Sequence, residues 1–372
     1  MGLQGMLKRN YTLAGLVVLV VAMVACQRDP DDVVDPTPGS GGGDDVLVDP
    51  SSFPLDSLSS YGFFTGPLAQ MLPKASVLPY DLIDPLFTDY AHKQRFVWMP
   101  EGSKATWVSD DALLDFPVGT MLIKTFYYDG VLPANERKIL ETRLLYRTSS
   151  GWEFADYVWN DAQTEATLYM DGLNVPMSWQ DDQGTVHDLI YRIPAQAECW
   201  TCHKNQNIAT PIGPKPRNMA RTLDIGGQVV DQLPHMEQVG YLDPSHPPIS
   251  QVMARWDDPA EPLEDRVRAY LDINCAHCHS VGGHCDYRPM RFDHAESEDP
   301  VQLGLCVPPE DPIQPDMTYI VSAGLPERSM MHFRLASTAV NARMPLLGRT
   351  VVHEEGLALI TEWIESIDPP CP

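Results

Sequence analysis

Residues 139–147 read Ile-Leu-Glu-Thr-Arg-Leu-Leu-Tyr-Arg. Every second residue from position 140 is mostly apolar: Leu140, Thr142, Leu144 and Tyr146. The residues that alternate with them are mostly charged: Glu141, Arg143, Leu145 and Arg147. A period of two residues is typical of a β-strand with one buried face. This stretch therefore predicts a strand in a sheet that packs on a core.

Six further stretches near it are rich in aromatic and β-branched residues: 95–99, 105–108, 121–128, 152–159, 166–170 and 186–193. Turn-forming residues separate them, including Pro100-Glu101-Gly102 and Asp171-Gly172. Short strands at this spacing favour an antiparallel sandwich or a barrel-like domain. We place it at residues 61–195.

The C-terminal half has helical periodicity instead. Residues 262–273 carry apolar side chains at i, i+4, i+7 and i+8. Residues 354–367 carry them at i, i+3, i+7 and i+10, which is also a helical spacing, before Pro369-Pro370. Residues 231–240 suggest a shorter helix. The expected fold class is therefore α+β multidomain, with the β-rich domain followed by an α-helical region at residues 262–372.

The N-terminus resembles a bacterial lipoprotein signal. Lys8 and Arg9 precede a short apolar run, and Met23-Val24-Ala25-Cys26 resembles a lipobox. The resemblance implies cleavage after residue 25 and lipidation of Cys26, which anchors a chain without spanning the bilayer. We expect the periplasm of a Gram-negative bacterium, with the outer membrane favoured. Residues 26–60, rich in Asp, Pro and Gly, would form a disordered acidic tether.

The net charge of the chain limits the kinds of molecule that it can bind. The whole chain has a formal charge of −25, and removing residues 1–25 removes two cations and no acid, which leaves 24 basic and 51 acidic residues and a charge of −27. Such a surface disfavours nucleic acid and suits basic partners. We expect redox protein partners.

Two motifs carry the chemistry: Cys199-Trp200-Thr201-Cys202-His203 and Cys275-Ala276-His277-Cys278-His279. Cys-x-x-Cys-His attaches c-type haem, two thiols forming thioethers while the imidazole ligates iron. A zinc ribbon pairs its Cys-x-x-Cys knuckles at roughly 15–20 residues, but 72 residues separate Cys202 from Cys275. A thioredoxin-like motif does not need the histidine. The sequence predicts two covalently bound haem c groups, with His203 and His279 as metal ligands.

The elements around the second motif follow a known order along the chain. A helix, Cys-x-x-Cys-His, a long loop, Met344-Pro345 and a C-terminal helix together resemble class I cytochrome c. The resemblance covers residues 262–368 and implies that Met344, 65 residues after His279, is its distal ligand. It also implies that the terminal helices cross. A core methionine is the ordinary alternative for Met344.

The first motif, in a segment at residues 196–261, has no Met-Pro after it. Met219, His235 and Met236 are the distal candidates, each with a packing role as its alternative, and Met219 ranks first because it follows the proline-rich loop at residues 211–216. A vacant sixth position is equally compatible with the sequence.

Three cysteines and one histidine remain. Cys285 and Cys306 are candidates for a disulfide across a loop, which would leave Cys371 unpaired. His277, inside the second motif, is expected to face solvent.

A wider resemblance covers most of residues 75–368. Phe116-Pro117-Val118-Gly119-Thr120, residues 159–166 and Pro211-Ile212-Gly213-Pro214 are similar to segments of a poorly characterised family of exported bacterial haem proteins. The main hypothesis is a membrane-tethered dihaem electron carrier. The alternatives are a dihaem oxidoreductase with a five-coordinate first haem, and a β-rich domain that binds a glycan, partner or substrate.

Overall fold

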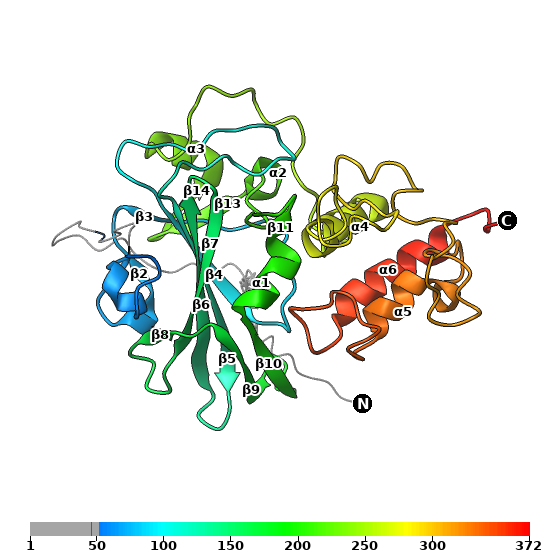
Figure 1. The fold of residues 1–372 in the computed structure, drawn as a ribbon, viewed down its shortest axis with the longest axis horizontal. Helices are drawn as coiled ribbons and strands as arrows, with labels where there is room; N and C mark the ends of the chain where they lie inside the picture. The colour runs from blue at the N-terminus through cyan, green and yellow to red at the C-terminus, as the bar shows by residue number, and fades with distance from the viewer. Residues whose placement is uncertain (1–45, 47–51) are drawn as a thin grey trace, which may run out of the picture.

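The computed structural model describes Val46 and residues 52–372. The predicted signal peptide, Cys26 and most of the tether lie outside these residues and stay predictions. The end of the predicted tether is not disordered, because Phe53 and Leu55 pack against the core of the sheet and Leu58 is buried in it. A β-sheet body holds the first half of the described chain, and helices α4, α5 and α6 lie to one side of it (Figure 1). None of the described helices combines the length and the apolar character that crossing a membrane requires.

The main sheet has eight strands, and all its pairings are antiparallel. The strands are β3 (Val77–Pro79), β4 (His92–Trp98), β5 (Met121–Val131), β6 (Glu136–Thr148), β7 (Gly151–Trp159), β8 (Ala166–Leu168), β9 (Asp171–Gln180) and β10 (Val186–Ala195). Strands β10, β9, β5, β6, β7 and β8 follow one another across the sheet, and β4 pairs with both β3 and β5. The antiparallel β-rich domain is confirmed.

Both faces of this sheet are covered. Ile123, Leu144 and Tyr157 pack on one face against the segment before β3, whereas Leu145 and Phe154 pack on the other against the segments after β10. Covering both faces explains why β6 does not alternate as predicted. Glu141, expected on the solvent side, is 0% exposed.

The predicted β-sandwich was wrong, because no second sheet packs on the first in the described part of the chain. Loops, short helices and three two-stranded ribbons cover the sheet, so the described residues contain no second stacked sheet. Residues 105–108 make only isolated bridges. Strand β9 was missed because Asp171-Gly172 suggested a turn and Pro176 disfavours a strand. It forms because β9 pairs along its length with β10 alone, and an edge tolerates proline.

The smaller elements complete the chain. The ribbons pair β1 (Phe64–Thr65) with β2 (Leu72–Pro73), β11 (Lys204–Asn205) with β12 (Ile208–Ala209), and β13 (Thr222–Ile225) with β14 (Gln228–Asp231). The α-helices are α1 (Gln196–His203), α2 (Pro216–Met219), α3 (Gln232–Gln238), α4 (Leu263–Leu271), α5 (Met330–Ala336) and α6 (Glu354–Ser366). The 3₁₀ turns are η3 (Leu58–Tyr61), η4 (Leu68–Gln70) and η6 (Pro326–Arg328), and a π-helical turn, η5 (Asp272–Ala276), extends α4. The three predicted helices are confirmed, while α1, α2 and α5 were not predicted.

Helices α4 and α6 share one apolar core with α5. They approach most closely at Gly356, where an added methyl carbon would lie 2.3 Å from Tyr270 Oη. Only glycine permits this contact, because interiors are close-packed. Helices α4 and α6 therefore pack directly against each other, and their crossing as in class I cytochrome c stays a prediction.

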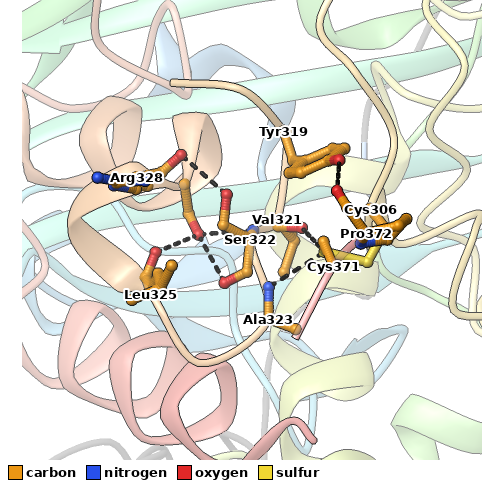
Figure 2. Close-up of a disulfide and its surroundings, with 10 residues drawn as sticks. Cys306, Tyr319, Val321, Ser322, Ala323, Leu325, Arg328, Cys371 and Pro372 are labelled. Carbon is orange, nitrogen blue, oxygen red and sulfur yellow. Dashed lines mark hydrogen bonds between the residues drawn. A yellow bond between two sulfur atoms is a disulfide. The ribbon is translucent and has the colours of Figure 1, made fainter. Parts of the chain in front are cut away.

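The disulfide differs from the prediction. Cys306 bonds to Cys371 (Figure 2). Cys285 is a buried free thiol. Nearby, Ala323 N donates to Cys371 Sγ at 3.4 Å. The pairing ties the C-terminus to the loop that follows the second motif. Spacing alone could not show that the C-terminus returns to this loop.

Candidate haem-binding sites

Helix α1 carries the whole first motif. Cys199, Cys202 and His203 are spaced i, i+3 and i+4, which places them on one helical face. The helix begins at the end of β10, where Glu198 accepts hydrogen bonds from Ala195 N at 2.6 Å and Arg192 Nη2 at 2.7 Å. The sheet therefore positions this motif.

His203 is held as a neutral imidazole. Its Nδ1 lies 2.7 Å from the carbonyl oxygen of Thr210, so Nδ1–H donates and the Nε2 lone pair is left free. Burial, more than any other influence, lowers the pKa of His203 to about 4. A neutral ring with its second nitrogen hydrogen-bonded is the usual state of a metal-ligating histidine.

The second motif follows α4 through the π-helical turn η5. Cys278 N and His279 N donate to the carbonyl oxygen of Cys275 at 3.1 and 3.0 Å, which winds the motif into a compact turn. His279 is 7% exposed, and its Nδ1 has no hydrogen-bond partner among the described residues. Burial is the main cause that lowers the pKa of His279 to about 4, so this imidazole too is neutral.

A cavity that is partly open to solvent lies against the second motif; we call it the second cavity. Its lining includes Cys275, Cys278, His279 and Met344, the four residues that the sequence assigned to this site. Three further methionines line it as well: Met290, Met330 and Met331. The free thiol of Cys285 also faces this space.

Another space, also partly open to solvent, lies against the first motif, between α1 and the sheet; we call it the first cavity. It is lined by Cys199, Cys202 and His203, and also by charged groups of the sheet, among them Lys124, Arg143 and Asp156. The sequence analysis missed these groups. A lysine in the middle of the largely apolar strand β5 was the signal that could have found one of them.

The two motifs meet in space. Cys202, Cys278 and His277 place one nitrogen and two sulfur atoms within 4.8 Å of one another, and Cys278 Sγ donates to the carbonyl oxygen of Thr201 at 3.3 Å. Cys202 and His277 line both cavities, as do Pro345 and Leu347. His277 was predicted to face solvent; instead it is half-buried in this shared wall, because the first motif packs on it.

The structure does not bring the predicted distal candidates to the first cavity. Met219 is 1% exposed and packs with Met236 in the apolar core beside α3, and His235 is half-buried on α3. None of the three lines the first cavity. Their position in the core is the packing role that the sequence left open for them.

The residues present fit two haem groups. All four motif cysteines are free, and burial raises the pKa of Cys199 to about 11 and of Cys275 to about 12, so both are neutral thiols. Each motif supplies two cysteine sulfur atoms and one neutral imidazole to its own cavity.

Comparison with known proteins adds no assignment. No family model, no curated protein and no solved structure matches this chain.

Proposed function

We propose that this chain is a lipid-anchored dihaem c-type cytochrome that transfers single electrons between periplasmic partners. The observation that carries the proposal is that the two motifs adjoin: 72 residues separate Cys202 from Cys275 in sequence, yet Cys202 lies beside Cys278 and lines both cavities. When bound, haem supplies an iron that accepts and releases one electron.

The protein residues have separate tasks. Cys199 and Cys202 would hold the first group, and Cys275 and Cys278 the second, through thioether bonds. His203 and His279 present neutral imidazole nitrogens to the metals. Met344, in the second cavity, would supply a thioether sulfur, which favours the reduced state and raises the potential.

The location and partners also remain proposals. The lipid anchor at Cys26 and the acidic segment that follows it would tether the body to the outer membrane. The charge of −27 left after residue 25 would attract a basic redox partner and would repel nucleic acid.

The test is the absorption spectrum of the dithionite-reduced protein, matured in a host that attaches haem, before and after carbon monoxide. We expect c-type Soret and α bands that carbon monoxide leaves in place, with two haems per chain by the pyridine haemochrome assay. The absence of c-type bands would refute the proposal.

A dihaem oxidoreductase is the second candidate. The charged lining of the first cavity favours it, because Arg143 and Asp156 there could orient a polar substrate. In that case the first haem would be five-coordinate, and carbon monoxide would shift about half of the Soret intensity.

A structural metal ion is the third candidate. Cys202, His277 and Cys278 form a three-ligand group suited to zinc. A zinc ion at this group would give no role to Cys199, His203, Cys275 and His279, or to the two cavities. The structural metal ion is therefore less favoured. Metal analysis showing one zinc per chain and no haem would establish it.

A further inference from the structure

One face of the sheet carries a row of charged side chains beside the first cavity. The strand register places Arg95, Lys124, Arg143 and Asp156 opposite one another on β4, β5, β6 and β7. Three adjacent cations would repel one another, since like charges directly opposite destabilise a sheet. Each cation therefore needs either a counter-charge or a neutral form.

Two of the three cations have acidic partners. Arg95 forms a buried ion pair with Asp81, and Arg143 donates to Glu141 at 2.6 Å. Lys124 has neither a hydrogen bond nor an ion pair with any residue that the structure describes; its Nζ lies 4.9 Å from the centre of the Phe126 ring. An amine left without a polar partner beneath a protein surface calls for an explanation.

The position of Lys124 suggests one. Its side chain lines the first cavity together with Cys199, Cys202 and His203. The amine and the proximal histidine thus face the same space.

We propose that Lys124 Nζ is the distal ligand of the first haem iron; this inference rests on the proposed function. Only the neutral amine has a lone pair for the metal, so its third proton is released to water. Burial, with help from Arg95, Lys93 and Arg143, lowers the pKa of Lys124 well below its usual value and so favours the neutral form.

Met170 and His277 are the competing side chains in this cavity. The Sδ of Met170 already accepts a hydrogen bond from Asp156 N at 3.3 Å, and the His277 ring is grouped with the sulfur atoms of Cys202 and Cys278 in the wall between the two motifs. The Lys124 amine has no such partner, which favours Lys124.

The test uses the oxidised dihaem protein and two spectroscopic measurements that need no activity: near-infrared magnetic circular dichroism and electron paramagnetic resonance. We expect the wild type to show two low-spin haems, one of the histidine–amine class and one of the histidine–methionine class. Lys124→Arg keeps a long basic side chain but cannot ligate, because its guanidinium stays protonated, and we expect it to turn about half of the haem high-spin. Lys124→Met should restore a low-spin site, now of the histidine–methionine class.

Lys93→Arg is the matched control, because Lys93 lies on the neighbouring strand and lines a different cavity. We expect its spectra to match those of the wild type. Unchanged spectra in Lys124→Arg, or loss of the low-spin signal in Met170→Ala instead, would overturn the inference while leaving the cytochrome proposal intact. Absence of c-type bands in the wild type would overturn the proposed function itself.

Discussion

The two motifs share one sequence pattern and have different surroundings. The first lies on a regular α-helix against a sheet, and charged side chains line its cavity. The second lies on a π-helical turn among helices, and four methionines line its cavity. If haem binds as proposed, these different surroundings would tune the two irons differently. The comparison teaches that one Cys-x-x-Cys-His pattern can lie in two different chemical environments, which the neighbouring elements determine.

The largest expected effect comes from removing attachment at one site only. Cys199→Ala with Cys202→Ala should lower the haem content from two to one per chain, and Cys275→Ala with Cys278→Ala should do the same. The remaining haem should be spectrally different in the two variants, as measured by pyridine haemochrome stoichiometry and the oxidised spectrum. Identical spectra of the remaining haem in the two variants would contradict the claim that the two sites have different surroundings.

Replacing the predicted methionine ligand should affect the second site alone. Met344→Ala should open one iron, so that carbon monoxide shifts about half of the reduced Soret intensity and one midpoint potential falls. Met290→Ala is the control, because Met290 lines the same cavity. If Met290→Ala opened the iron and Met344→Ala did not, the ligand assignment would be wrong.

The disulfide should stabilise the half that contains the second site. Cys306→Ser with Cys371→Ser opens a 65-residue loop, and we expect a loss of about 2–4 kcal/mol in the free energy of unfolding, measured by urea denaturation. Cys285→Ala removes a free thiol and should leave the disulfide intact. A Cys285–Cys306 peptide in non-reducing mass spectrometry would contradict the structure.

The smallest effect concerns the contact between the two halves. The His353 ring stacks on Phe87, with ring centres 4.0 Å apart, and its Nδ1 lies 3.2 Å from Tyr270 Oη. Burial lowers its pKa to about 4, against the opposing charge of Glu355. The folded state therefore binds fewer protons than the unfolded state between about pH 6.5 and 4, and stability falls as the pH drops through this window.

The free energy of unfolding should fall less between pH 7 and pH 4.5 in His353→Gln than in the wild type. We expect the difference between the two to be about 1–3 kcal/mol, measured by urea denaturation at both pH values. His284→Gln, in an exposed loop, is the control. If the free energy of unfolding changed equally with pH in both variants, His353 would not be the source of the pH dependence.

The strands and helices with strong periodicity could be predicted, as the close match of α6 (Glu354–Ser366) to residues 354–367 shows. The β9 strand could not, because Pro176 disfavours a strand until an edge position accommodates it. The burial of Glu141 could not, since it depends on a covering layer that arrives from later in the chain. Met219 illustrates the same limit, because its position after a rigid loop says nothing about the core into which it packs.

The sequence by itself determined the chemistry that is available: four motif thiols, two imidazoles, a Met-Pro pair and a strong negative charge. These are properties of residue type and local spacing. The tertiary structure alone decided that the motifs adjoin, that Cys371 bonds to Cys306 and that Lys124 faces His203 across a cavity. Such juxtapositions join residues far apart in the chain, and only the packing of sheet, loops and helices brings them together.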